Sequence, residues 1–257
     1  MPKEILYLDN IEVYIEDSYE EMSRRAADIF VDELTENPNG VFGFATGSTP
    51  LGLYKELIRR FNNGEIDFSS IATFNLDEYY PIKKDNPQSY DYFMRTNLFN
   101  HINVNPDYIY IPNGEAPNAF KECLNYEKLI STEDGIELQI LGIGENGHVG
   151  FNEPNKYFKS YTNYVALSDS TINANARFFD SLEDVPTHAI TMGIKTIMQA
   201  RKILLLANSS KKSEILLKAL MGYITPMVPA SILQLHPDVT VVTDKEAGQA
   251  LVKKYND

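Results

Sequence analysis

Short apolar runs alternate with longer segments of helical periodicity along most of the chain. Almost wholly apolar runs such as Val41 to Ala45, Leu138 to Ile143 and Lys202 to Ala207 are typical of strands buried on both faces of a parallel sheet. Between them, segments such as Ser18 to Leu34 carry apolar residues at the spacing of an amphipathic helix. The alternation predicts an α/β fold in three αβα layers, with a mainly parallel, Rossmann-like sheet.

The same pattern places the other elements. Further strands are expected at Ile11 to Glu16, Ile71 to Phe74, Tyr108 to Ile111, Tyr164 to Leu167, His188 to Met192 and Val239 to Val242. Further helices are expected from Pro50 to about Asn62, Ser89 to about Asn100, Ala119 to Ile130, Met192 to Ala200, about Ser210 to Met221 and Lys245 to Tyr255. No repeat or long linker divides the chain, so residues 1–257 are expected to form a single domain.

The composition of the chain argues against several classes of function. The chain lacks a long apolar run and a secretory N-terminus, which predicts a soluble, cytoplasmic protein. A net charge of −13 argues against nucleic acid and anionic membranes as partners, because both attract clustered Lys and Arg. A single cysteine, Cys123, excludes an internal disulfide and a multi-cysteine metal site, and its helical setting favours a buried thiol over a nucleophile. A small anionic substrate remains compatible with this composition.

Polar loops follow four of the expected strands. They carry Thr46-Gly47-Ser48-Thr49, Asp77-Glu78, Gly144 to Glu153, and Ser209-Ser210-Lys211-Lys212. Ligands of an open parallel sheet bind beyond the carboxyl ends of its strands. The four loops are therefore expected to open on one rim.

The first of these loops has the composition of an anion site. Small residues and hydroxyls precede a helix, whose free N–H groups and dipole favour a phosphate. Because the nucleotide and dinucleotide glycine motifs are both absent, a phosphomonoester is the better fit. Taken alone, a Thr-Gly-Ser-Thr loop is more often a helix cap than a phosphate site. Lys212 and Arg177 are candidates to complete a phosphate clamp, or ordinary solvated cations.

Acid and base chemistry is expected from two of the loops. Side chains of adjacent Asp77 and Glu78 should diverge, so that one carboxylate faces the crevice and can abstract a proton next to a carbonyl. The alternative is a capping or ion-paired carboxylate. Histidine is the side chain suited to proton transfer near neutral pH, so His148 is expected to move protons on sugar oxygens, with Glu153 or Asn146 holding its ring. Its alternative is a surface histidine in a tight turn.

Several long motifs, in order along nearly the whole chain, resemble those of glucosamine-6-phosphate deaminases. The most specific are Phe-Asn-Leu-Asp-Glu-Tyr (74–79) and Gly-Ile-Gly-Glu-Asn-Gly-His-Val-Gly-Phe-Asn-Glu-Pro (142–154). Ala-Thr-Gly-Ser-Thr-Pro (45–50), Gln-Ser-Tyr-Asp-Tyr-Phe-Met (88–94), Asn-Ala-Arg-Phe-Phe (175–179) and Ser-Ile-Leu-Gln-Leu-His (231–236) accompany them.

This resemblance implies a reaction without metal or organic cofactor: isomerisation of an amino-sugar phosphate with loss of ammonia, giving fructose 6-phosphate in amino-sugar catabolism. It implies that His148, helped by Glu153 and Asn146, opens the sugar ring, and that Asp77 moves the C2 proton to C1. It also implies phosphate binding by the Thr46 to Thr49 loop, Arg177 and Lys212. The polar stretch at 168–183 resembles the family's lid.

Two departures from the family pattern matter. Hexameric members carry Asp where this chain has Asn146, and an amide orients an imidazole without stabilising its cation, so an altered pH dependence is expected. Asn163 and Val165 stand where the regulated members have cations. Allosteric activation and a regulated hexamer are therefore not expected, and a monomer or small homo-oligomer is.

Three other functions remain open from the sequence. A galactosamine 6-phosphate deaminase would differ only in the C4 epimer that it accepts. The related 6-phosphogluconolactonases share the Gly-His turn, although Phe-Asn-Glu-Pro after His148 resembles the deaminase branch. A sugar-phosphate-sensing domain would need an attached DNA-binding segment, for which the few residues before Ile11 are too short.

Overall fold

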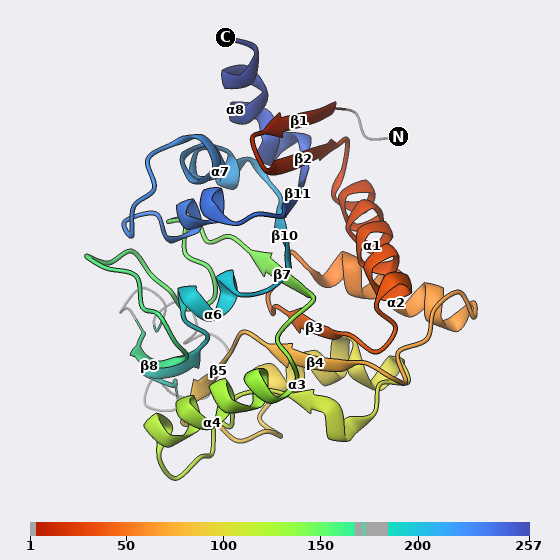
Figure 1. The fold of residues 1–257 in the computed structure, drawn as a ribbon, viewed down its shortest axis with the longest axis vertical. Coiled ribbons are helices and arrows are strands. Elements are labelled where there is room, and N and C mark those ends of the chain that lie inside the picture. The colour runs from red at the N-terminus through yellow and green to blue at the C-terminus, as the bar shows by residue number, and fades with distance from the viewer. Residues whose placement is uncertain (1–3, 168–171, 173–184) are drawn as a thin grey trace.

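An eight-stranded sheet forms the centre of the computed structural model, which describes residues 4–167, 172 and 185–257 (Figure 1). Its strand order is β1-β2-β11-β10-β7-β3-β4-β6, and only β1 runs antiparallel to its neighbour. The strands are β1 (Glu4–Leu8), β2 (Ile11–Glu16), β3 (Val41–Phe44), β4 (Ala72–Asn75), β6 (Ile109–Tyr110), β7 (Leu138–Gly142), β10 (Lys202–Ala207) and β11 (Val239–Asp244). The predicted, mainly parallel α/β sheet is confirmed.

Helices lie on both sides of this sheet, with α1 and α2 on one side and α6 and α7 on the other (Figure 1). Ser18 caps α1 by accepting a hydrogen bond from the Glu21 N–H. The α-helices are α1 (Tyr19–Glu36), α2 (Leu51–Asn62), α3 (Tyr90–Asn97), α4 (Ala119–Thr132), α6 (Ile194–Met198), α7 (Ser213–Met221) and α8 (Lys245–Asn256). Because helices cover both sides of the sheet, the central strands β3 and β10 are almost wholly buried.

Two strands were not expected. The N-terminal arm forms β1, which pairs with β2 through a tight turn. More important for the site, β4 ends at Asn75 and the chain starts a new strand, β5 (Asp77–Tyr80), in place of the loop predicted there. Its Asp-Glu-Tyr-Tyr sequence lacks the apolar alternation of a strand, and pairing with a distant segment overrides that local signal.

The partner of β5 lies more than a hundred residues further along the chain. β5 pairs antiparallel with β9 (His188–Thr191), and β9 pairs with β8 (Asn163–Ala166), forming a separate three-stranded sheet. Leu76 joins the two sheets, since its N–H donates to Phe44 O at 3.1 Å and its carbonyl accepts from Met192 N at 2.8 Å. Asp77 is thus held between two sheets. The predicted lid at 168–183 lies outside the described residues.

Candidate active site

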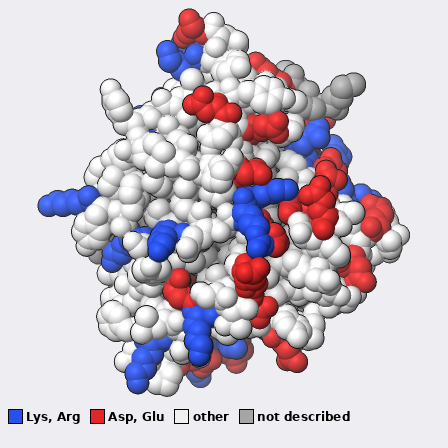
Figure 2. All heavy atoms as spheres, viewed as in Figure 1, with Lys and Arg blue, Asp and Glu red and all other residues white. Residues whose placement is uncertain are grey.

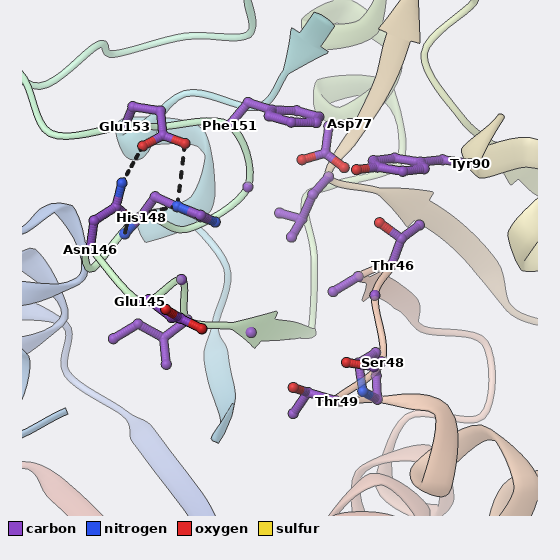
Figure 3. A pocket seen from close by; sticks show the side chains of 18 of the residues that line it. Thr46, Ser48, Thr49, Asp77, Tyr90, Glu145, Asn146, His148, Phe151 and Glu153 are labelled. Atoms are coloured by element: carbon purple, nitrogen blue, oxygen red, sulfur yellow. Dashed lines mark hydrogen bonds and ion pairs between the residues drawn. The ribbon is translucent and has the colours of Figure 1, made fainter. Parts of the chain in front are cut away.

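One pocket of about 610 Å³ opens at the carboxyl ends of β3, β4 and β7 (Figure 3). It is lined by the loops that follow these strands and by single residues of α3 and of the turn before α7. The expected shared rim is therefore present. Among the described candidates, those that line it are Thr46, Gly47, Ser48, Thr49, Asp77, Asn146, His148, Glu153 and Lys212.

The loop before α2 borders one end of the pocket. Thr46, Ser48 and Thr49 lie on the same side of the pocket (Figure 3). The Tyr19 hydroxyl holds the loop in place: it lies 3.0 Å from both Ser48 O and Thr49 O, and it accepts the Gly52 N–H at 2.7 Å. Fixed N–H groups and hydroxyls at the start of a helix are suited to binding an anion.

The two adjacent lysines have different surroundings. Lys212 lines the pocket, and burial lowers the pKa of its ammonium group, an effect that Glu145 opposes and Lys211 assists. Lys211 is exposed and lies 3.9 Å from the Glu145 carboxylate. Within the part of the chain that the structure describes, Lys212 is thus the basic side chain that lines the pocket. Arg177 lies outside the described residues.

His148 is held by two side chains of its own loop. Its Nδ1 lies 2.7 Å from Asn146 Oδ1 and 3.3 Å from Glu153 Oε1. The Asn146 amide also donates from Nδ2 to Glu153 Oε2 at 2.5 Å. Because both neighbours of Nδ1 are acceptors, Nδ1 carries the proton and Nε2 is left with a lone pair. The ring is therefore oriented as a base.

Glu153 is the charged member of this group. Its hydrogen bond to His148 is the main cause that lowers the pKa of the carboxyl group; partial burial opposes the effect, and the Asn146 amide adds to it. Glu153 is therefore ionised at neutral pH, beside the nitrogen that becomes cationic when Nε2 takes a proton. The asparagine supplies orientation and the glutamate supplies charge.

Two glycines of the loop are required by close approach. A Cβ on Gly144 would lie within 2.2 Å to 2.4 Å of the His148 ring. A Cβ on Gly150, whose φ is +57°, would lie 2.9 Å from Thr191 Oγ1 and 3.2 Å from Asp77 Oδ2. Because Gly144 has no side chain, the His148 imidazole packs directly against its backbone. The absence of a side chain at Gly150 likewise allows the loop to approach the carboxylate of Asp77.

Asp77 lies across the pocket from His148, next to Tyr90 (Figure 3). Only 5% of the residue is exposed. Burial is the main cause that raises the pKa of Asp77 to about 8; the charge of Glu78 adds to it, and a hydrogen bond with Thr191 opposes it. A buried carboxylate with a raised pKa is a strong base once it is ionised.

Glu78 points away from the pocket, so the adjacent carboxylates diverge as the sequence predicts. Its carboxylate accepts the N–H groups of Tyr79 at 2.8 Å and of Tyr90 and Asp91 at 2.9 Å. Burial raises the pKa of Glu78 to about 7, although these three N–H groups favour its ionised form. Glu78 thus fixes the start of α3, and with it Tyr90, against the strand that carries Asp77.

Two residues at the pocket were not identified from the sequence. Tyr90 lines it, and its ring stacks on Phe151 at 6.0 Å with an interplanar angle of 3°. Thr191 lies opposite Asp77 in the β5–β9 pair, and its Oγ1 accepts the Phe151 N–H at 3.1 Å. The motif around Tyr90 was visible in the sequence, whereas nothing local marks Thr191, because the strand pairing alone brings it to Asp77.

Comparison with known proteins identifies the family. The sequence profile of the Glucosamine-6-phosphate isomerases/6-phosphogluconolactonase family matches residues 16–242. A glucosamine-6-phosphate deaminase of Clostridium novyi (strain NT) is 55% identical over 233 residues, which cover 91% of this chain and 97% of that protein. The corresponding protein of Thermoanaerobacter pseudethanolicus (strain ATCC 33223 / 39E) is 53% identical over 241 residues, covering 94% and 95%.

Solved structures agree at the level of the fold. A monomeric glucosamine-6-phosphate deaminase superposes with a TM-score of 0.88 at 45% identity, covering 93% of this chain and 99% of that one. A 6-phosphogluconolactonase from Trypanosoma brucei, at 19% identity and a TM-score of 0.74, covers 93% of this chain and 98% of its own, and shares the fold. Both the site motifs and the extent of these matches place the chain in one branch: it belongs to the glucosamine-6-phosphate deaminase family.

Proposed function

We propose that this pocket converts glucosamine 6-phosphate and water into fructose 6-phosphate and ammonia. The observation that carries the proposal is the arrangement of three groups around one cavity: an anion-binding loop, a histidine with a free Nε2, and a buried aspartate with a raised pKa. A phosphate at the loop would leave the sugar between His148 and Asp77, which face each other across the pocket (Figure 3).

Ring opening is assigned to His148. Its Nε2 takes the proton of the C1 hydroxyl and returns a proton to the ring oxygen as the C1–O bond to that oxygen breaks, which gives the open-chain aldehyde. The imidazolium that forms in between is stabilised by the Glu153 carboxylate, 3.3 Å from Nδ1. Asn146 keeps the ring in the tautomer that leaves Nε2 unprotonated.

Isomerisation is assigned to Asp77. The carboxylate removes the proton from C2 while the C1 oxygen takes a proton from the substrate's own ammonium group, which gives an enolamine with a C1 hydroxyl, and the same carboxyl group returns the proton to C1. The product is an imine at C2, and water adds to it and releases ammonia, leaving the ketone of fructose 6-phosphate. The raised pKa of Asp77 makes it a better base for this carbon acid than an exposed carboxylate.

Phosphate binding is assigned to the Thr46 to Thr49 loop and Lys212, with Arg177 as a further cation. Lys212 is half-buried at the rim, where water screens its charge less than at the surface. The stretch at 168–183 is proposed as the lid over this pocket. No step is assigned to a metal or organic cofactor.

The partner of the protein is proposed to be the small sugar phosphate alone. On the face that Figure 2 shows, acidic and basic side chains are interspersed, and the whole chain carries a net charge of −13, which disfavours nucleic acid. Among the described helices none is long and apolar enough to cross a membrane. We propose a cytoplasmic monomer or small homo-oligomer without allosteric activation, since Asn163 and Val165 of β8 supply no cation.

The proposal is tested by measuring ammonia release from glucosamine 6-phosphate and, separately, from galactosamine 6-phosphate. Turnover of the first substrate at a much higher kcat/KM is expected, in line with the named activity of the relatives. Hydrolysis of 6-phosphogluconolactone is assayed in parallel. Rapid lactone hydrolysis without ammonia release from either amino sugar would contradict the proposal, and preference for the galactose epimer would reassign the substrate.

A further inference from the structure

Ser209, in the turn that leads from β10 to Lys212, has a backbone conformation that is otherwise almost confined to glycine. Its φ is +75° and its ψ is 152°. Two other described residues besides glycine have positive φ, Asp9 and Asp134, and both are aspartates in surface turns, a residue type that tolerates this region. A serine in this conformation persists only where its surroundings hold it there.

The group that holds Ser209 is Asp244, at the end of β11. The Asp244 carboxylate accepts the Ser209 N–H, with distances of 3.0 Å to Oδ2 and 3.2 Å to Oδ1. The same carboxylate caps α8 by accepting the Ala247 N–H at 2.8 Å. Asp244 is buried and does not line the pocket. Its charge is therefore directed at the backbone of the turn and not at a ligand.

A second contact ties the same turn to another segment that lines the pocket. Thr49 donates from Oγ1 to Asn208 Oδ1 at 2.8 Å, so the turn is bound to the anion-binding loop before α2. After Ser209 the chain makes a single 3-10 turn, Ser210–Lys212, in which the Lys212 N–H donates to Ser209 O at 3.0 Å. The backbone conformation of Ser209 therefore determines the position of the Lys212 backbone, from which the lysine side chain extends.

We propose that Asp244 is a positioning residue for phosphate binding: by holding Ser209 in its positive-φ conformation, it keeps Lys212 at a fixed distance from the Thr46 to Thr49 loop. This inference rests on the proposed function, since it needs a substrate with a phosphate at that end of the pocket. A lysine side chain is long and flexible, and a fixed backbone reduces the conformational entropy that it loses on binding.

The first test is the Asp244→Asn variant, alone and combined with Lys212→Met. Asparagine is also a good helix cap, so α8 is expected to stay folded, which circular dichroism checks. Loss of the charged acceptor is expected to raise KM about tenfold and to change kcat less than about twofold. In the Lys212→Met background, Asp244→Asn is expected to add almost nothing, because it acts through that lysine. Equal, additive losses would overturn the proposal.

The second test is rescue by glycine at position 209. Glycine adopts a φ of +75° without steric cost, so Ser209→Gly combined with Asp244→Asn is expected to recover most of the lost affinity. A weakened α8 cap would not be repaired by this change. Absence of any recovery would therefore assign Asp244 to the cap of α8 alone and overturn the positioning role. Should Asp244→Asn fail to fold, Asn208→Ala breaks the other contact, and its KM increase should likewise vanish in the Lys212→Met background.

Calorimetric titration with glucosamine 6-phosphate separates this inference from the proposed function. If the wild-type protein neither binds nor deaminates the sugar phosphate, the proposed function fails. If the wild-type protein does both and Asp244→Asn binds it as tightly as the wild type, the positioning role fails and the proposed function stands. About tenfold weaker binding by Asp244→Asn, reversed by glycine at position 209, is the expected result.

Discussion

Asp77 and Glu153 are both carboxylates of the same pocket, yet their environments differ in every respect that controls a pKa. Asp77 is buried between two sheets beside a second carboxylate, Glu78, and its pKa is raised to about 8. Glu153 is about one third exposed at its side chain, lies next to an imidazole and an amide, and has a lowered pKa. One site thus contains a carboxylate that binds a proton readily and one that stays charged.

Two carboxylates of one site can thus have different roles because their surroundings differ. A carboxylate that must take and return a proton benefits from a pKa near the working pH, whereas one that stabilises a neighbouring cation must remain ionised throughout. Burial raises the pKa of a carboxyl group toward the working pH, whereas contact with hydrogen-bond donors and solvent keeps its pKa low. Three substitutions test this division, and the one with the largest expected effect removes the base itself.

Asp77→Asn is expected to lower kcat by roughly 10²-fold to 10⁴-fold, because general base catalysis contributes about that much. Binding of glucosamine 6-phosphate should persist, since the residues proposed to bind the phosphate are unchanged. Exchange of the C2 proton with deuterated water, followed by NMR, should be lost. The exposed Asp107→Asn serves as the matched control. Undiminished exchange in Asp77→Asn would show that Asp77 is not the base and that its raised pKa has no role in the reaction.

Glu153→Gln is expected to have the next largest effect, a decrease of roughly 10-fold to 100-fold in kcat. Glutamine is able to hold the ring but does not stabilise the imidazolium. Adding Asn146→Asp to Glu153→Gln returns a carboxylate to the position 2.7 Å from Nδ1 and should recover part of the activity. Glu20→Gln, on the exposed first turn of α1, is the control. Full activity of Glu153→Gln would show that orientation alone suffices.

Thr191→Val is expected to have the smallest effect and a dependence on pH. Asp77 is faced by Thr191, by the charge of Glu78 and by the hydroxyl end of Tyr90, and the Thr191 hydrogen bond is the one that lowers its pKa. Without it the pKa rises further. The base acts only when ionised, so kcat/KM, which should increase through about pH 8 in the wild type, should increase at a higher pH in the variant.

The expected loss is roughly threefold to tenfold at pH 7 and little at pH 9. Thr191→Ser keeps the hydroxyl and should restore the wild-type profile. A uniform loss at all pH values, unrelieved by serine, would mean that Thr191 contributes packing only, and would contradict its effect on the proton affinity of Asp77.

Much of the architecture followed from local pattern. The strands β2 and β10 have the predicted bounds, because periodicity depends on residues close in the chain. The shared rim also followed, since parallel strands direct their carboxyl ends to one edge. By contrast, β5 was taken for a loop, because its partner β9 is remote and its own sequence is polar.

The amino-acid sequence alone supplied the chemical types of the site: the glycines that let a loop approach, a histidine with two possible partners, adjacent carboxylates of which one should face the ligand, and a lysine pair. These are properties of short segments. The pKa of Asp77, the contact of Thr191 with it, and the hold of Asp244 on Ser209 come from residues far apart in the chain. Burial and hydrogen bonding at such positions exist only after folding, so the tertiary structure sets the strength of the base and the place of the cation.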